Sequence, residues 1–328
     1  MKQFDLQHLN LTKYLFYTGK GGVGKTSIAC ATAVTLADNG KKVLLVSTDP
    51  ASNLQDVFST ELDGKGVPIA EVPGLVVANL DPIQAAAEYR EGVIAPYRGK
   101  LPESVIINME EQLSGSCTVE IAAFNEFTNF ITDEAAAKEY DHIIFDTAPT
   151  GHTLRMLQLP SAWSNFISES THGASCLGQL SGLEDKKEMY KEAVDTLADS
   201  KLTTLILVSR LESSPLKEAE RASKELADLG VRNQLMIVNG VLPAYDDGIS
   251  ESLYNKQQKA LADMPAGLKD IAAYFVPLRA YNITGMENVR NLLVKDSLAL
   301  SNNTLNAADI PTLRKVIDDL DASGKKVI

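Results

Sequence analysis

A glycine-rich loop near the N-terminus has the residue types and spacing that bind phosphate. The apolar run Tyr14–Thr18 leads directly into the sequence GKGGVGKT, and a stretch of helical composition follows. Glycines let backbone N–H groups close around phosphate oxygens, and the N-terminus of the following helix adds partial positive charge. This strand, loop and helix context predicts a site for ATP and Mg²⁺. The residues expected to hold the nucleotide here are Gly21, Gly22, Val23, Gly24, Lys25, Thr26 and Ser27.

Three residues of this loop have individual expected roles. Lys25 is expected to reach the β- and γ-phosphates, and Thr26 is expected to ligate Mg²⁺. Lys20 is a second lysine, directly after the first glycine, and this resembles the deviant Walker A class of P-loop proteins. In that class the extra lysine crosses a dimer interface to the partner's nucleotide. A solvated loop lysine is the alternative for Lys20.

Two carboxylates end apolar strand-like runs. Asp49 closes the run from Val46, and Asp146 closes the run from Ile143. Ligands of open α/β sheets bind beyond the carboxyl ends of the strands, so both acids are expected near the phosphates. An acid that ends such a strand can hold Mg²⁺ through a water or a threonine, which is the role expected of Asp146. Either residue could instead cap a helix.

The elements that must position these residues alternate along the chain. Short apolar runs separated by stretches of helical periodicity predict a doubly wound, mostly parallel α/β sheet. A single domain over residues 1–328 is expected, with an α-helical subdomain inserted at roughly 82–140 and 159–200, where no strand pattern is found. The expected strands are Tyr14–Thr18, Lys42–Ser47, Leu75–Asn79, His142–Asp146, Thr203–Val208, Gln234–Val238 and Tyr274–Val276, and the expected helices are Lys25–Asn39, Pro215–Leu229, Ser250–Asp263 and Met286–Leu298.

Composition narrows the function classes. The formal net charge of −12 repels polyphosphates, so nucleic acid is not an expected partner. The N-terminus lacks the apolar core of a secretory signal, and no apolar run approaches the roughly 20 residues of a membrane helix. Three cysteines without a C-x-x-C pair fit a reducing compartment. A cytoplasmic protein is therefore expected.

Two further segments resemble one family specifically. The sequence DTAPTGHTLR, residues 146–155, and the sequence STDPASN, residues 47–53, resemble motifs of the arsenite-transporting ATPases and of the related ATPases that target tail-anchored proteins. The resemblance implies that Asp49 activates the attacking water and that Asp146 serves the Mg²⁺ shell. It implies that Gly151 senses the γ-phosphate through its backbone amide. It also implies that Asn239 contacts adenine, with Pro277 lining the base.

The cysteines separate the two branches of this family. Targeting ATPases of the eukaryotic kind carry a zinc-binding C-x-x-C pair, which this sequence lacks. The segments around Cys117 and Cys176 instead resemble metalloid-ligand segments of the arsenite-transporting branch. Soft thiolates suit As(III) and Sb(III), and His152 is a further expected ligand. A lone cysteine is commonly a small buried hydrophobe, which stays the alternative for Cys117 and Cys176 and is the expectation for Cys30.

The sequence therefore favours an ATPase that couples hydrolysis to arsenite or antimonite efflux by a membrane pump. Many proteins of this family have two P-loops in tandem, whereas this sequence has one, so a homodimer is expected. Such a protein would lie at the inner face of the membrane when bound to the pump, and an arsenic metallochaperone is a further partner that the resemblance allows. Three rivals stay open: a targeting chaperone for tail-anchored proteins, a reductase bridging an iron–sulfur cluster between protomers, and a scaffold without catalysis.

Overall fold

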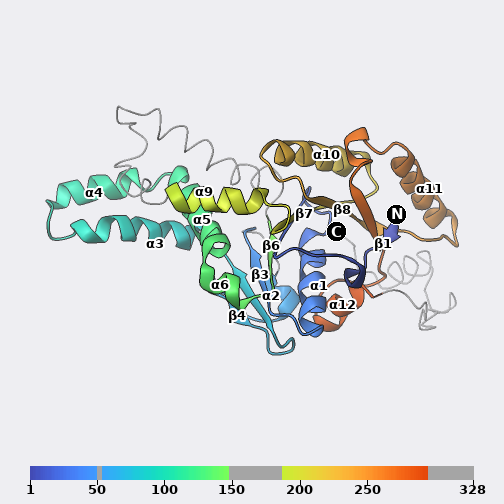
Figure 1. Cartoon of the computed structure of the whole chain (residues 1–328), viewed down its shortest axis with the longest axis horizontal. Coiled ribbons are helices and arrows are strands. Elements are labelled where there is room, and N and C mark those ends of the chain that lie inside the picture. Colours follow the sequence, from blue (N-terminus) through green and yellow to red (C-terminus); the bar gives the residue numbers. More distant parts are fainter. Residues whose placement is uncertain (50–53, 148–186, 295–328) are drawn as a thin grey trace, which may run out of the picture. The chain divides into compact units, whose positions relative to one another are not determined.

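The computed structural model describes residues 1–49, 54–147 and 187–294. Within them a nine-stranded sheet has the order β1-β9-β8-β7-β2-β6-β3-β5-β4 (Figure 1). Neighbouring strands run parallel except for the antiparallel pair of β4 and β5. The mostly parallel α/β fold expected from the sequence is confirmed. The strands are β1 Lys2–Gln3, β2 Tyr14–Thr18, β3 Val43–Ser47, β4 Val67–Pro68, β5 Leu75–Asn79, β6 His142–Asp146, β7 Thr203–Ser209, β8 Gln234–Val241 and β9 Ala272–Pro277.

Helices cover both faces of this sheet. The helix that follows the glycine-rich loop packs on one face with α12, and α5, α9 and α10 pack on the other. The central strands β2 and β3 are buried at every residue, which explains their continuous apolar runs. The helices are α1 Lys25–Asp38, α2 Leu54–Phe58, α3 Pro82–Ile94, α4 Glu103–Gln112, α5 Ser116–Thr132, α6 Glu134–Glu139, α9 Lys187–Ala198, α10 Ser213–Asp228, α11 Gly248–Ala262 and α12 Met286–Leu292, with short 3-10 turns at Leu6–His8, Ala95–Tyr97 and Ala266–Leu268.

The helical stretch between β5 and β6 contains α3 to α6 and no strand. Of the second expected helical stretch, only the end is described, as α9. Helix α5 packs against α3 and α9. The division of these helices into a subdomain of their own stays a prediction, and Met1–Leu293 form one compact unit by contacts.

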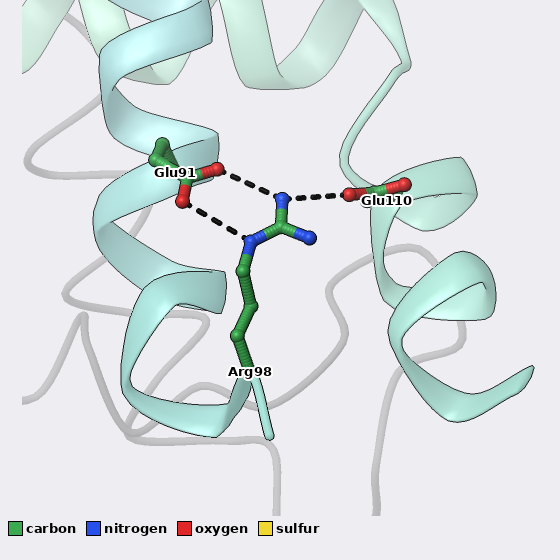
Figure 2. Close-up of polar contacts among 3 residues, drawn as sticks. All are labelled: Glu91, Arg98 and Glu110. Atoms are coloured by element: carbon green, nitrogen blue, oxygen red, sulfur yellow. Dashed lines mark hydrogen bonds and ion pairs between the residues drawn. The ribbon is translucent and has the colours of Figure 1, made fainter. Parts of the chain in front are cut away.

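A guanidinium joins α3 to α4. Arg98, just after the turn that follows α3, donates two hydrogen bonds to Glu91 and one to Glu110 of α4, the latter at 2.8 Å (Figure 2). Helix α4 has a single buried residue, Ile106, so apolar packing alone holds it weakly. A bidentate guanidinium shared between two carboxylates is the kind of surface ion pair that does contribute. Arg98 therefore links the end of α3 to α4 on the surface of the protein.

Some boundaries differ from expectation. Strands β7, β8 and β9 are longer than the strands expected from the sequence. Helix α12 ends at Leu292 rather than at Leu298, and the described residues end at Val294. The expectation missed β1 and β4, because two-residue strands leave no periodicity to detect. No helix in the described ranges has both the length and the apolar character needed to cross a lipid bilayer.

Candidate functional site

The glycine-rich loop lies between β2 and α1, at the carboxyl edge of the sheet. Gly24 caps α1 with a φ of 94°, and Gly19 has a φ of 150°. A Cβ added to Gly19 would lie 2.1 Å from the carbonyl oxygen of Val208, at the end of β7. A Cβ on Gly24 would lie 2.3 Å from the side-chain amide nitrogen of Asn239. Glycine is therefore required at both positions for the loop to lie against the ends of β7 and β8.

The first turn of α1 and the end of β6 meet beneath this loop. Thr26 Oγ1 donates a hydrogen bond of 2.7 Å to Asp146 Oδ2. The Asp146 side chain is fully buried, and its other oxygen, Oδ1, has no hydrogen-bond partner among the described residues. Burial raises the pKa of Asp146 to about 6, against the opposing effects of the Thr26 hydrogen bond and of Lys25.

This donor set fits a divalent cation. Mg²⁺ prefers hard oxygen ligands, and a hydroxyl beside a carboxylate supplies them. Among the described residues, Oδ1 of Asp146 is a buried acceptor without a partner, which costs free energy. Contact with a cation or with its bound water would recover that free energy. Thr26 and Asp146 are thus the described residues that could hold Mg²⁺. Elsewhere in the described ranges, no three His, Cys, Asp or Glu side chains gather as a metal site would require.

Two lysines flank the loop in different environments. Lys25 is buried, with 6% of its surface exposed, and burial lowers its pKa while Asp146 and Asp49 raise it. Its Nζ donates to the carbonyl oxygen of Lys20 at 3.5 Å, a weak contact. Lys20 is exposed, and its Nζ donates to Ser214 Oγ in the first turn of α10 at 2.7 Å. Lys25 therefore points over the loop, whereas Lys20 lies at its rim.

Asp49 belongs to the same charge cluster. It is half-buried beyond the end of β3, and its backbone N–H donates to Ser47 Oγ at 3.3 Å. Its charge favours the cationic form of Lys25 and disfavours ionisation of Asp146. The sheet thus brings Asp49, Lys25, Thr26 and Asp146 to one edge, although 120 residues separate Thr26 from Asp146.

The residues expected at the base lie at the next strands of this edge. Asn239 Nδ2 donates to the Val23 carbonyl oxygen at 2.9 Å, so β8 is tied directly to the glycine-rich loop. Pro277 is buried and pairs with Val241 in the β8–β9 register, which is irregular between Asn239 and Val241. Asn239 and Pro277 therefore lie on adjacent strands.

Sequence reasoning missed two residues here. Gln257 of α11 is buried, donates to the Gly240 carbonyl oxygen and accepts from the Leu242 N–H, both at 2.9 Å. Arg210 follows β7, with its Nη2 3.1 Å from the place of a Cβ on Gly240. A polar residue directly after a buried strand was the available signal for Arg210. No signal existed for Gln257, whose neighbours along α11 are polar as well.

The described residues do not test the metalloid site expected from the sequence. Cys117 is the second residue of α5, but nothing is described of its side chain. Gly151, His152 and Cys176 lie outside the described residues. Cys30 is fully buried in the core between α1 and the sheet, as expected.

Known proteins resemble this chain over most of its length. A family model described as anion-transporting ATPase matches residues 12–296. The arsenical pump-driving ATPase of Acidiphilium multivorum is 48% identical over 317 residues, which are 95% of this chain and 54% of that protein. The putative arsenical pump-driving ATPase 2 of Aquifex aeolicus is 31% identical, over 85% of this chain and 97% of that protein. The ATPase GET3 of Debaryomyces hansenii is 32% identical, over 87% of this chain and 89% of that protein. The chain thus spans about half the length of its relative from Acidiphilium multivorum.

Proposed function

Since this chain belongs to the anion-transporting ATPase family, we propose that it hydrolyses ATP with Mg²⁺ and that arsenite or antimonite accelerates the hydrolysis. The contact of Thr26 with Asp146 beside the buried Lys25 is the observation that supports this most strongly. It places a cation, a hydroxyl and a carboxylate under a loop whose glycines leave room for phosphates. Electrostatic stabilisation of transferring phosphoryl groups needs such a set.

Each residue at this edge has a part in the proposed reaction. Lys25 binds the β- and γ-phosphates, and Asp49 orients the attacking water and accepts its proton. Thr26 and Asp146 would hold Mg²⁺, which would supply positive charge to offset that of the phosphates. Asn239 and Pro277 contact the base, and the Gly151 amide contacts the γ-phosphate. The role proposed for Lys20 is to reach the nucleotide of a second protomer.

The proposed metalloid ligands are Cys117, Cys176 and His152. As(III) and Sb(III) are thiophilic, and a pyramidal centre needs three ligands, which two cysteines and one histidine supply. Two relatives carry the name of arsenical pump-driving ATPases, and this supports the assignment. We propose that a homodimer works at the inner face of the membrane with an efflux pump, and that an arsenic metallochaperone delivers the ion.

A targeting ATPase for tail-anchored proteins is the second candidate. The relative from Debaryomyces hansenii supports it, because that protein is 32% identical over 87% of this chain. Against it stand the lower identity, 32% rather than 48%, and the absence of a C-x-x-C pair from the sequence. Capture of a hydrophobic tail peptide by the purified protein, without any response to antimonite, would favour this candidate.

The ATPase rate with and without antimonite tests the leading proposal. Coupling between two sites is typically worth five-fold or more, so we expect antimonite to raise the wild-type rate at least about five-fold. Cys117→Ala should lose most of this stimulation because it removes one thiolate. Cys30→Ala is the matched control, since it also removes one thiol, and it should keep the wild-type ratio of stimulated to basal rate. Equal stimulation in wild type and Cys117→Ala would remove Cys117 from the mechanism.

A further inference from the structure

A cluster of aromatic rings joins the helical insertion to the sheet directly behind the phosphate site. Phe16 of β2 and Phe145 of β6 stack face to face, with ring centroids 4.5 Å apart. Phe127 of α5 meets both rings edge-on, at 5.8 Å from Phe16 and 5.1 Å from Phe145. All three side chains are at most 2% exposed. Phe127 is therefore wedged against the two neighbouring strands at one level.

Those two strands carry the functional residues. Phe145 directly precedes Asp146, and Phe16 lies three residues before Gly19, where the glycine-rich loop begins. Successive side chains of a strand point to opposite faces, so Phe145 faces α5 while Asp146 faces α1 and Thr26. The end of β6 is thus held between α1 on one face and Phe127 on the other. A displacement of Phe127 would move the backbone that carries Asp146.

Helix α5 reaches from the sheet to the segment around Cys117. It has 17 residues, and Phe127 lies ten residues after Cys117, which is about 15 Å along a helix axis. Phe124 extends the cluster from Phe127 to α9: its ring centroid lies 6.2 Å from that of Phe127 and 5.1 Å from that of Tyr190 of α9. A helix transmits a shift at one end to its other end, because its hydrogen bonds make it rigid.

The packing of α5 also leaves polar atoms unpaired. The Nδ2 of Asn125 and the Oγ1 of Thr128 are buried without a hydrogen-bond partner in the described part of the chain. Asn125 uses its Oδ1 to accept from the Tyr190 hydroxyl. A buried polar atom without a partner costs free energy, so a second position of α5 that pairs these atoms would recover that cost. Among the described residues, the present position of α5 thus leaves two buried polar atoms that a shift of the helix could pair.

We propose that Phe127 is a positioning residue for Asp146. A shift of α5 would move Phe127, and Phe127 would in turn move Asp146 at the proposed Mg²⁺ and phosphate site. The inference rests on the proposed ATPase function and specifies its regulation. Metalloid capture near Cys117 would shift α5, Phe127 would move with it, and the end of β6 would be repositioned against Thr26.

Replacing Phe127 by leucine tests this, with Phe130→Leu as the matched control. Phe130 lies on the same helix and packs partly buried against the same core, but it makes none of the ring contacts to Phe16 or Phe145. We expect Phe127→Leu to cut the antimonite stimulation of kcat to less than about half the wild-type factor, and Phe130→Leu to keep it. Wild-type stimulation in Phe127→Leu would overturn the inference and leave the proposed function intact.

A second readout does not depend on metalloid. If Phe127 positions Asp146, then Phe127→Leu should raise the Mg²⁺ concentration for half-maximal binding of a fluorescent ATP analogue at least about three-fold, and Phe130→Leu should not. An unchanged Mg²⁺ dependence would contradict the inference even if antimonite failed to stimulate the wild type. Failure of the proposed function is recognised separately, by an unstimulated wild type.

Thr128→Val separates a movable helix from a merely structural one. The change keeps the shape of the side chain and removes the unpaired hydroxyl, so it should raise the melting temperature. Because it stabilises the present position of α5, it should also lower the antimonite stimulation. A higher melting temperature with full stimulation would overturn the claim that α5 moves.

Discussion

Individual atoms of the neighbouring strands determine the conformation of the glycine-rich loop. Gly19 passes over the end of β7, where a methyl group would lie 2.1 Å from the Val208 carbonyl oxygen. Gly22 also has a positive φ, of 79°, but a methyl group there would meet nothing within 4 Å. A substitution at Gly19 therefore causes a clash with the backbone of β7, whereas a substitution at Gly22 causes conformational strain alone.

Alanine at these two positions should have unequal effects. Gly19→Ala must move either the loop or β7, so we expect binding of a fluorescent ATP analogue to weaken by about 100-fold or more. Gly22→Ala carries only the strain of a left-handed alanine, of the order of 1–2 kcal/mol, and should weaken binding by about ten-fold or less. Equal losses in the two variants would show that the Val208 contact does not determine the loop.

At the scale of elements, much of the site follows from the sequence because it depends on strand ends. The apolar runs locate β2, β3 and β6, and parallel strands bring their carboxyl ends to one edge, which brings Asp49 and Asp146 near Lys25. The contacts of Asn239 with Val23 and of Lys20 with Ser214 depend on residues 216 and 194 positions apart. Such contacts are determined by strand order and loop packing, which no local pattern encodes.

The β8–α11 connection gives a prediction at this scale. Gln257→Leu removes the partners of the buried Gly240 carbonyl and of the part-buried Leu242 N–H, beside the proposed base site. Unfolding by urea should show a loss of about 1–3 kcal/mol from the buried Gly240 carbonyl, with a smaller addition from the part-buried Leu242 N–H. Gln258→Leu is the control, since Gln258 is exposed on the same helix and its loss should cost less than about 0.5 kcal/mol. Equal stability of the two variants would contradict this role of Gln257.

In the whole molecule, the proposed function requires that the nucleotide site and the metalloid site share one conformational equilibrium. The proposed nucleotide site lies at the carboxyl ends of β2, β3 and β6. The aromatic cluster behind it connects these strands to α5, the helix that contains Cys117. Lys20 contacts Ser214 of its own chain, so the proposed role in a second protomer requires that it exchange this hydrogen bond for a phosphate. A hydrogen bond from the charged Lys20 ammonium to a neutral hydroxyl is worth about 1.5–3 kcal/mol at most, and a negatively charged phosphate oxygen is a stronger acceptor that can replace it.

Reciprocal linkage gives the most direct test of this coupling. The affinity of the purified protein for antimonite should be measured with and without Mg²⁺ and a non-hydrolysable ATP analogue, and the affinity for the analogue with and without antimonite. Two ligands that share one equilibrium must change each other's affinity by the same factor. We expect each ligand to raise the affinity for the other by one common factor, of about five or more. Binding of both ligands with affinities that do not respond to each other would contradict it.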